Sequence, residues 1–469
     1  MKLTLSEIAG ICQGSLHNSL GTEIVSGVAI DSRRVKSGDL YVPIKGEKFD
    51  GHQFIATAGG NGAVAAFCDQ QRADLVQDLN LPVIIVGSAL KATQELAAWY
   101  LKQTKAQVVA ITGSVGKTST KDMVAAVLQT KFKVLANKGN LNTEIGLPLT
   151  LFALKPGTDY PVLEMGMRGP GQITRLTEIA PPSIGVLINV GESHIELLGS
   201  REAIATAKGE LLAALPAQGW AILNGDDPLV RSQASRSTAP LIYYGLSSQP
   251  DLQVTAINLE QLSDGRVRFI LENGPEKTPV ILAAPGQHNV QNALAAAAVG
   301  YSLGLTGPEI AIGLSQVDLT PMRCQVLETP GGYRVINDTY NACYDSMRAG
   351  LDLLASLKKE SNRSIAVLGD MLELGENCIP AHRRVGQYVV ESGVDYLVTV
   401  GTRSRQIVIG AVSNGFITER VWSVPDIDSA VEVLHSLVQE TDVILVKGSR
   451  SMQMEKVVAA MVGESGNGY

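Results

Sequence analysis

The sequence predicts an α/β protein of three domains, and three observations lead to this class. Short apolar runs bounded by glycine or proline recur along the chain, helical segments separate most of them, and the run VVAIT leads into a glycine-rich turn. With 469 residues and roughly 150 residues per domain, the chain has room for about three hydrophobic cores. We expect boundaries near residues 104 and 319, which gives domains 1–104, 105–319 and 320–469.

The first domain is expected to be small and of mixed α/β structure. Its apolar runs GVAID, DLYVPI, AVAAF and PVIIV are short and have glycine and proline between them. The N-terminus has no signal-peptide core, and no later run approaches ~18 uninterrupted apolar residues. The sequence therefore predicts neither export nor a membrane span.

The second and third domains each alternate strands with helices. YPVLEMG, IGVLINVG and GWAILNGDD follow VVAIT and predict a central parallel sheet of the P-loop ATPase type. After DLTPMRCQV the alternation resumes with YRVINDTYN, SIAVLGDM, DYLVTVG and DVILVKGS, which predicts a Rossmann-like C-terminal domain. Before the last of these strands, Ala430, Val433, Leu434, Leu437 and Val438 share one helical face. The tail GESGNGY is expected to be frayed.

Composition excludes some classes of function. The net charge of -7 and the charged fraction of 18% describe a mildly acidic globular protein and disfavour a nucleic-acid partner. The five cysteines form no C-x-x-C pair, so the sequence indicates neither a zinc site nor a disulfide framework. We expect reduced thiols in a cytoplasmic protein.

The segment TGSVGKTS at residues 112–119 is typical of a phosphate-binding loop. Gly113 and Gly116 permit a tight turn between a buried strand and the N-terminus of a helix, where free N–H groups and the helix dipole attract phosphate. Lys117 supplies a point charge for the phosphate oxygens, and the Thr118 hydroxyl can hold Mg²⁺. The longer Gly-x4-Gly-Lys pattern would need glycine where the chain has Ile111. The alternative is an ordinary glycine turn with a solvated lysine.

Three polar side chains follow strands of the same predicted sheet. Glu164 ends the run YPVLE at the carboxyl edge, where ligands of open α/β sheets bind, and is a candidate metal ligand. His194 lies just past the next strand, and Lys208 follows in ATAKGELL. Taken singly, this histidine could be a loop residue and this lysine a solvated one. Their placement near a phosphate loop favours a shared site.

Two amide-rich segments offer further polar contacts. The loop NKGNLNTEIGLPLT carries Asn140 and Asn142, whose amides could meet a polar ligand. In PGQHNVQNALAAAAVG, Asn289 and Asn292 lie in the first turns of a predicted helix. Helix capping alone would explain this second pair.

With these pieces in order, the chain resembles the Mur ligases over nearly its whole length. TGSVGKTS matches the phosphate loop of that family, which lacks the first glycine, so Ile111 is no defect. The stretch AIDSRRVKSGDLYVPIKGEKFDGHQFI is similar to the domain that holds the UDP end of the substrate. NDTYNACYDSM, LGDMLELG and VKGSRSMQME are similar to the C-terminal motifs of the member that adds D-alanyl-D-alanine to a UDP-linked tripeptide.

The resemblance implies an ATP-dependent ligase of peptidoglycan precursor synthesis, which works through an acyl phosphate and serves cell-wall growth, cell shape and division. It implies a monomer with ATP and Mg²⁺ as cofactors and with UDP-N-acetylmuramoyl-tripeptide and D-alanyl-D-alanine as substrates. The implied catalytic residues are Lys117, His194 and Lys208. The implied nucleotide contacts are Gly113, Ser114, Val115, Gly116, Lys117, Thr118, Ser119, Asn289, Arg323 and Asp338. The implied substrate contacts are Asp31, Ser32, Arg33, Gly46, Asn140 and Asn142. The implied Mg²⁺ ligands are Thr118, Glu164, His194 and Lys208, with Lys208 carbamylated.

Rival functions and two departures from the family pattern stay open. A tripeptide-forming ligase should carry a D-N-P-R motif, which the chain lacks, and a folylpolyglutamate synthase should lack the UDP-binding domain. A nucleotide-gated binding protein would need the loop but not Glu164, His194 and Lys208.

Two positions depart from the family pattern. The family commonly reads N-A-N-P where this chain reads N-A-C-Y, with Cys343 and Tyr344 in the last two positions, so the local backbone there is an open question. Alanine is usual at the position of Ser193, a small change. The sequence leaves open whether the third residue of the tripeptide is lysine or diaminopimelate.

Overall fold

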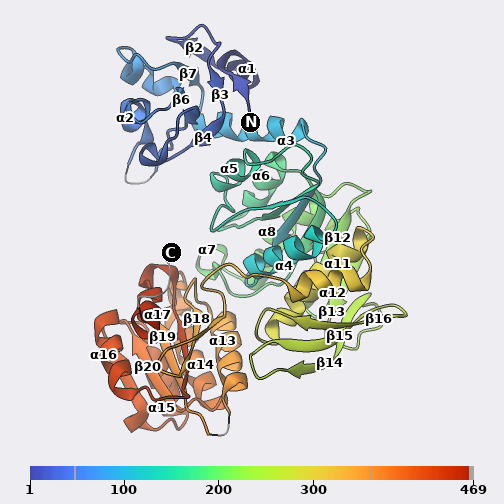
Figure 1. Ribbon diagram of the computed structural model, residues 1–469, viewed down its shortest axis with the longest axis vertical. Helices are drawn as coiled ribbons and strands as arrows, with labels where there is room; N and C mark the ends of the chain where they lie inside the picture. The colour runs from blue at the N-terminus through green and yellow to red at the C-terminus, as the bar shows by residue number, and fades with distance from the viewer. Residues whose placement is uncertain (47–48, 360, 464–469) are drawn as a thin grey trace. The chain divides into compact units, whose positions relative to one another are not determined.

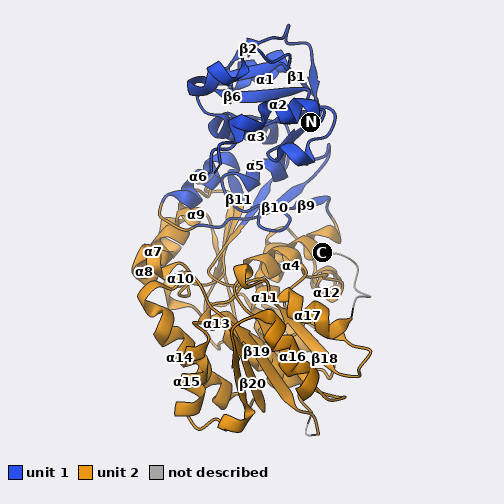
Figure 2. Cartoon of the chain, turned by 90° about the vertical axis from the view of Figure 1, so that its left-hand side faces the viewer, with its two compact units in different colours: residues 1–110, 132–167, 171–183 blue, residues 111–131, 168–170, 184–469 orange. Residues whose placement is uncertain are grey.

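The structure is a computed structural model that describes residues 1–46, 49–359 and 361–463. The chain divides into two compact units, coloured separately in Figure 2. Unit 1 consists of residues 1–110, 132–167 and 171–183, and unit 2 of residues 111–131, 168–170 and 184–469. Residues 464–469, the last six of the tail expected to be frayed, lie outside the described residues. The three domain boundaries expected from the sequence stay a prediction.

Unit 1 contains a five-stranded sheet in the order β2-β7-β6-β5-β4, a two-stranded sheet of β1 and β3, and the parallel pair β9 and β10. The strands are β1 Leu3–Thr4, β2 Ser15–His17, β3 Ile24–Val25, β4 Gly27–Ala29, β5 Asp39–Tyr41, β6 Ala65–Asp69, β7 Val83–Val86, β9 Val134–Ala136 and β10 Tyr160–Glu164. All four apolar runs predicted for the first domain are strands of the five-stranded sheet, so that part of the prediction is confirmed.

The helices of unit 1 begin at recognisable caps. Thr4 and Glu7 form a capping box at the first helix, because the Thr4 hydroxyl accepts from the Glu7 N–H and the Glu7 carboxylate accepts from the Thr4 N–H. Ser88 caps the third helix through Lys91. The helices are α1 Leu5–Ile11, α2 Ile55–Gly60, α3 Ala89–Lys102, α5 Gly146–Leu151 and α6 Gln172–Ile179, with short 3-10 turns η1 Ser32–Arg34, η2 Gly51–Phe54 and η3 Gln70–Val76.

In unit 2, six strands follow one another in the order β16-β15-β14-β13-β12-β11. The pairs from β11 to β14 are parallel, whereas β14, β15 and β16 form antiparallel hairpins. The strands are β11 Pro182–Leu187, β12 Trp220–Asn224, β13 Leu241–Gly245, β14 Val254–Gln261, β15 Val267–Asn273 and β16 Glu276–Leu282. The runs IGVLINVG and GWAILNGDD correctly predicted β11 and β12, whereas β13 and the hairpins were missed. Gly274, with a φ of 58°, and Pro275 form the two-residue turn between β15 and β16, a turn signal that could have revealed the second hairpin.

Helices accompany this sheet, and the longest, α11, carries a run of alanines. In α11, every residue from Ala293 to Gly300 is buried. The helices are α4 Lys117–Gln129, α7 Ile195–Leu198, α8 Arg201–Lys208, α9 Glu210–Ala213, α10 Pro228–Arg231, α11 His288–Ser302 and α12 Gly307–Ser315, with the 3-10 turn η4 Ala234–Arg236. Two strands are divided between the units: β8, Val108–Thr112, after residue 110, and β11 after residue 183.

The C-terminal part of unit 2 holds a six-stranded sheet in the order β17-β18-β22-β19-β20-β21, parallel except for β17. Its strands are β17 Gln325–Glu328, β18 Arg334–Asp338, β19 Ser364–Gly369, β20 Tyr396–Val400, β21 Val421–Val424 and β22 Val443–Lys447. Its helices are α13 Tyr344–Leu357, α14 Cys378–Glu391, α15 Arg405–Ser413, α16 Ile427–Leu437 and α17 Glu455–Val462, with η5 Gly375–Asn377, η6 Thr418–Arg420 and η7 Arg450–Met452.

These helices cover both faces of the C-terminal sheet (Figure 1). One core cluster joins the sheet to α13, α14 and α15, and the other joins it to α16 and α17. The face predicted from Ala430, Val433, Leu434, Leu437 and Val438 lies in the second cluster, as expected. The predicted α/β class is confirmed. Within the described ranges, none of the helices has the length and hydropathy that a membrane span requires.

Candidate functional site

A glycine-rich loop, residues 113–116, connects β8 to α4 as the sequence predicts. Gly116 has a φ of 84° and caps α4, and a Cβ there would lie 2.8 Å from the Asn292 Oδ1 atom. A Cβ at Gly113 would lie only 2.2 Å from the Cγ1 atom of Ile188. Both positions therefore require glycine, the first for its conformation and the second for its close packing. The positive end of the α4 dipole lies at this loop and suits an anion.

The two lysines predicted to be catalytic meet at this loop. Lys117 donates from its Nζ atom to the carbonyl oxygens of Gly113 at 2.8 Å and Ser114 at 3.2 Å. Lys208, at the end of α8, donates to the same Gly113 oxygen at 2.8 Å. The Lys208 side chain is buried, although a lysine on a solvated helix face would be exposed. The structure thus brings Lys117 and Lys208 together, 91 positions apart in the sequence.

The segment after β11, residues 189–194, is hydrogen-bonded to the glycine-rich loop. The Asn189 carboxamide accepts from the N–H groups of Ser114 at 3.0 Å and Val115 at 2.9 Å, and it donates to the Val115 oxygen at 2.8 Å. The Ser193 hydroxyl donates to the Ser114 oxygen at 3.5 Å. The 189–194 loop therefore holds the glycine-rich loop in its conformation.

His194 ends the 189–194 loop in a left-handed conformation with a φ of 65°. Its Nδ1 atom lies 3.2 Å from a carboxylate oxygen of Glu373, a residue that also approaches Arg168 at 3.3 Å. Burial lowers the pKa of His194, and the nearby cation of Lys117 lowers it further. Both effects favour the neutral imidazole, which is the form that binds a metal.

The start of α4 also meets the segment that leads into the C-terminal sheet. Arg323 donates to the Thr118 hydroxyl at 3.1 Å, and its guanidinium lies 3.9 Å from the centre of the Tyr340 ring. Asp338 accepts from the Cys324 N–H at 3.2 Å and from the buried Lys447 ammonium at 2.5 Å. Arg323 and Thr118 are therefore together, whereas the Asp338 carboxylate is held by an ion pair.

The two asparagines of α11 belong to a buried hydrogen-bond network. Asn289 donates to the Pro285 oxygen at 2.7 Å and accepts from Asn292 at 2.8 Å, and Asn292 accepts from the Thr120 hydroxyl at 3.1 Å. These hydrogen bonds join α11 to α4 behind the glycine-rich loop. The predicted contact of Asn289 with the nucleotide would require some of them to break, because the Asn289 amide is hydrogen-bonded at both ends.

Other predicted residues belong to unit 1. Glu164 is buried at the end of β10, and its Oε1 atom accepts from the Asn142 side chain at 2.7 Å. Its N–H donates to the Asn137 side chain at 2.9 Å. Asn140 is exposed in the same loop, and its backbone oxygen accepts from the Asn142 N–H at 2.8 Å. The structure brings Glu164 and Asn142 into contact, so a predicted metal ligand is oriented by a predicted substrate residue.

The predicted UDP contacts lie in the five-stranded part of unit 1. Asp31 accepts two hydrogen bonds from the Arg33 side chain, at 2.9 and 2.8 Å, and one from the Arg33 N–H. The Arg33 hydrogen bonds lower the pKa of Asp31 to about 2. Ser32 is buried at the start of η1, and Gly46 is exposed and donates its N–H to the Phe49 oxygen at 2.9 Å.

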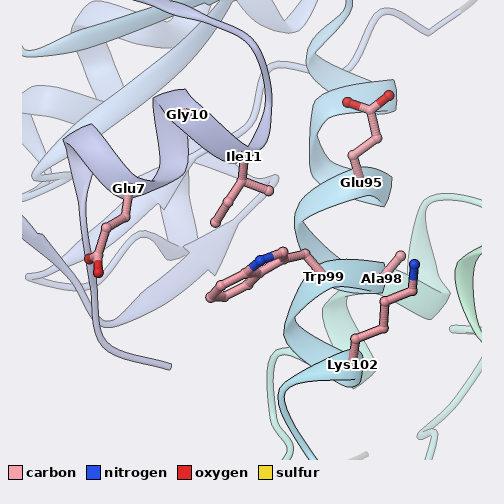
Figure 3. Close-up of a pocket in the computed structure, with 7 residues that line it drawn as sticks. All are labelled: Glu7, Gly10, Ile11, Glu95, Ala98, Trp99 and Lys102. Carbon is pink, nitrogen blue, oxygen red and sulfur yellow. The ribbon is translucent and has the colours of Figure 1, made fainter.

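A separate open cavity of about 560 Å³ lies between α1 and α3 (Figure 3). The Trp99 ring lies between the two helices, and Glu7, Gly10, Ile11, Glu95, Ala98 and Lys102 complete the lining. The lining contains none of the residues predicted for the UDP substrate. This cavity is therefore not the predicted substrate site.

The residues around the glycine-rich loop fit a nucleotide phosphate. The Ser114 hydroxyl is buried and has no hydrogen-bond partner in the described part of the chain, which suits a group that a ligand completes. The oxygen donors Thr118 and Glu164 are of the kind that Mg²⁺ prefers. No cluster of three or more His, Cys, Asp and Glu side chains arranged for a metal occurs among the described residues. The predicted ligand set contains two such side chains, Glu164 and His194.

Several residues of this region were not predicted from the sequence. Asn189 lies directly after the run VLI, so its position at a strand end was a usable signal. Glu373 and Tyr340 lie in the C-terminal segment, and only tertiary structure brings them to His194 and Arg323. Glu373 has a φ of 59°, a conformation that sequence alone does not reveal for glutamate.

Comparison with known families gives three consecutive matches. Residues 24–111 match the model described as Mur ligase family, catalytic domain, and residues 111–300 match the Mur ligase middle domain. Residues 322–450 match the model described as Mur ligase, glutamate ligase domain.

Comparison with individual proteins gives relatives of the same length. The chain is 37% identical to a UDP-N-acetylmuramoyl-tripeptide--D-alanyl-D-alanine ligase of Bacillus subtilis, covering 98% of this chain and 99% of the relative. Its fold is similar to a crystal structure of MurF from Acinetobacter baumannii, with a TM-score of 0.88 at 27% identity, covering 98% of this chain and 99% of that one. It is also similar to a MurF ligase of Thermotoga maritima in complex with ADP, with a TM-score of 0.81 at 28% identity, covering 93% and 96%.

Proposed function

The chain belongs to the Mur ligase family, and on that premise we propose that it is an ATP-dependent ligase that joins D-alanyl-D-alanine to UDP-N-acetylmuramoyl-tripeptide in peptidoglycan precursor synthesis. The relatives that carry this name match end to end. The observation that carries the proposal within the site is the convergence of Lys117 and Lys208 on Gly113, at the turn between β8 and α4.

The glycine-rich loop binds the phosphates of ATP. Gly113 to Gly116 form the turn at the positive end of the α4 dipole, Lys117 places its ammonium at this turn, and Thr118 and Ser119 add hydroxyls on the first turn of α4. Arg323, in the segment that leads into the C-terminal sheet, contacts the phosphates. Its hydrogen bond to Thr118 at the start of α4 supports this role. Asn289 would contact the adenine after its buried hydrogen bonds rearrange, and Asp338 would lie at the interface that closes over the nucleotide. The Thermotoga relative in complex with ADP supports nucleotide binding by this fold.

Thr118 and Glu164 would hold one Mg²⁺, and His194 with Lys208 would serve a second. Bound there, such ions would offset negative charge on the transferring phosphoryl group. An ammonium cannot be a ligand, so Lys208 serves only after it loses a proton and the free amine reacts with CO₂ to give a carbamate and a second proton. The carbamate nitrogen keeps one N–H, which can still donate to the Gly113 oxygen as the amine does. Its two oxygens are the hard ligands that Mg²⁺ prefers.

The reaction has two steps, because a carboxylate is a poor electrophile. An oxygen of the tripeptide carboxylate attacks the γ-phosphorus of ATP, and ADP leaves. The amine of D-alanyl-D-alanine then attacks the acyl carbon, loses a proton, and inorganic phosphate leaves. Lys117 stabilises the charge that develops in the first step, and the approach of Glu373 to His194 supports a C-terminal domain that closes over the site and excludes water.

The first domain holds the UDP end of the tripeptide substrate through Asp31, Ser32, Arg33 and Gly46, while Asn140 and Asn142 contact the substrate near the metal. We further propose the domain limits 1–104, 105–319 and 320–469, a cytoplasmic location and a monomeric state. The third residue of the tripeptide, lysine or diaminopimelate, is an outcome of the assay and not part of the proposal.

The test is phosphate release from ATP with each substrate left out in turn. We expect phosphate only when Mg²⁺, a UDP-tripeptide and D-alanyl-D-alanine are all present, with both lysine and diaminopimelate tripeptides tried. Release with a UDP-dipeptide and a free diamino acid would indicate a tripeptide-forming ligase instead. ATP binding without turnover on any acceptor would indicate a nucleotide-gated binding protein.

A further inference from the structure

A row of alternating aromatic rings and guanidinium groups crosses α13 and α14. The Arg384 guanidinium lies 3.8 Å from the centre of the Tyr344 ring. Arg348 lies 5.8 Å from the same ring and 4.7 Å from that of Tyr388. At such distances a guanidinium is attracted to the face of the ring. Stacking in this row therefore fixes the direction in which the Arg384 side chain extends from α14.

Arg384 ends on the 189–194 loop. Its Nη1 atom donates to both carboxylate oxygens of Glu192, at 3.1 and 3.3 Å. Three residues earlier, Asn189 holds the N–H groups of Ser114 and Val115 in the glycine-rich loop. Contacts thus lead from Tyr344 through Arg384 to Glu192, and the backbone of the 189–194 loop continues from Glu192 to Asn189, which contacts the glycine-rich loop.

An isolated pair of this kind would be weak. The Arg384 and Glu192 side chains are 47% and 30% exposed, and holding two long side chains in one geometry costs conformational entropy. A ring stacked under the guanidinium restricts the arginine before the carboxylate arrives, so less entropy is lost when the pair forms. Tyr344 supplies this ring.

Tyr344 stands at the first position of α13, after the capping residue Cys343. The backbone N–H at this position needs no intrahelical partner, so proline would suit the helix start equally well. Cys343, with a φ of -145° and a ψ of 169°, has the extended backbone that a following proline requires. The family pattern noted above has proline here, and only an aromatic residue can stack on Arg384.

We propose that Tyr344 is a positioning residue for the nucleotide site, which acts by holding Arg384 on Glu192 and so fixes the 189–194 loop against the glycine-rich loop. The inference rests on the proposed function only for its effect on ATP. The contacts themselves predict an effect on the loop whatever the reaction.

The kinetic test compares Tyr344→Pro with Tyr344→Phe in the full chain. Proline keeps the helix start and removes the ring, and we expect the KM for ATP to rise about fivefold while kcat changes less than twofold. Phenylalanine keeps the ring and should restore the wild-type KM. Arg384→Gln should raise the KM as much as Tyr344→Pro, and the double variant should be no worse than either single one.

The control is Tyr396→Leu. Tyr396 also stacks under an arginine, Arg363 at 5.0 Å, but that arginine pairs with Asp442 inside the C-terminal domain. Its loss should lower the thermal midpoint without changing the KM for ATP. A Tyr344→Pro protein with a wild-type KM, or additive effects of Tyr344→Pro and Arg384→Gln, would overturn the proposal.

Hydrogen–deuterium exchange of the ligand-free protein separates this inference from the proposed function. In Tyr344→Pro and Arg384→Gln, amides of the 189–194 loop should exchange severalfold faster than in the wild type, and in Tyr344→Phe at the wild-type rate. Faster exchange in a protein that ligates no substrate would support the positioning role and contradict the proposed function. Unchanged exchange in both variants would contradict the positioning role alone.

Discussion

Lys117 and Lys208 donate to one atom, the carbonyl oxygen of Gly113, each at a distance of 2.8 Å. Two ammonium groups that share an acceptor lie close together and repel each other, and both are at least partly buried. The arrangement is most favourable when one of the two gives up its positive charge. The proposed carbamylation of Lys208 does this, and it leaves Lys117 as the cation of the phosphate site.

Replacing Lys117 with alanine should lower kcat about 100-fold, because a donor aimed at developing phosphoryl charge contributes on the order of 3 kcal/mol to transition-state stabilisation. Steady-state kinetics measures the effect. Lys131→Ala, an exposed lysine just beyond the other end of α4, is the control and should keep the wild-type rate. Comparable rates for the two variants would contradict the assignment of the phosphate loop.

Replacing Lys208 with arginine should abolish most activity, because arginine keeps the positive charge and does not form the carbamate. The modification itself is measurable without turnover. Protein equilibrated with ¹³C-labelled CO₂ should give a carbamate ¹³C resonance that Lys208→Arg lacks. A wild-type rate for Lys208→Arg, or the same resonance in both proteins, would refute carbamylation at this position.

Asp31→Asn should weaken binding of the UDP substrate about threefold, because asparagine cannot accept both hydrogen bonds of the Arg33 side chain. Since the pKa of Asp31 is lowered to about 2, the wild-type pair should persist through the whole neutral and mildly acidic range. Calorimetry with the UDP-tripeptide measures the affinity. Asp264→Asn is the matched control, because Asp264 pairs with Arg266 at the same sequence spacing in another turn. Equal losses in both variants would indicate a general effect on folding.

His382 should make the C-terminal domain less stable in mild acid. It is fully buried, its Nδ1–H donates to the Cys378 oxygen at 2.6 Å, and its Nε2 accepts from the Met371 N–H at 3.0 Å. Burial lowers the pKa of His382, so the native imidazole stays neutral while the unfolded chain takes up a proton below about pH 6.5. The stabilisation is therefore complete above that pH and is lost as the pH falls toward the native pKa.

The thermal midpoint measured from pH 7 to pH 5 tests this sign. We expect it to fall by about 2–4 °C more in the wild type than in His382→Gln, whose side chain does not titrate. His435→Gln removes an exposed histidine of α16 and should follow the wild-type curve. A wild-type midpoint that rises on acidification would contradict the assignment of a neutral native imidazole.

The parts of the fold and site that the sequence predicts are those encoded locally. The runs before Asp31, Glu164 and Asn189 are strands because their apolar and β-branched residues are buried in sheets, and Gly116 marks its turn by a conformation that few other residues adopt. The hairpins of β14 to β16 were equally readable, since buried and exposed residues alternate through β16.

The remaining features depend on contacts between distant segments. Nothing near Glu373 in the sequence indicates that it meets His194, and nothing near Asn289 indicates that its amide is used within a buried chain to Thr120. The positions of Tyr344 and Arg384 likewise acquire meaning only when α13 and α14 lie together. Local pattern determines which elements form, and packing determines which side chains meet.

The most direct measurement follows an ¹⁸O label placed in the terminal carboxylate of the UDP-tripeptide during one turnover with ATP, Mg²⁺ and D-alanyl-D-alanine. If the chain is the proposed ligase, mass spectrometry will find the UDP-pentapeptide, and the phosphate released will carry one ¹⁸O atom from the carboxylate. Unlabelled phosphate, or phosphate without the pentapeptide, would contradict ligation through an acyl phosphate.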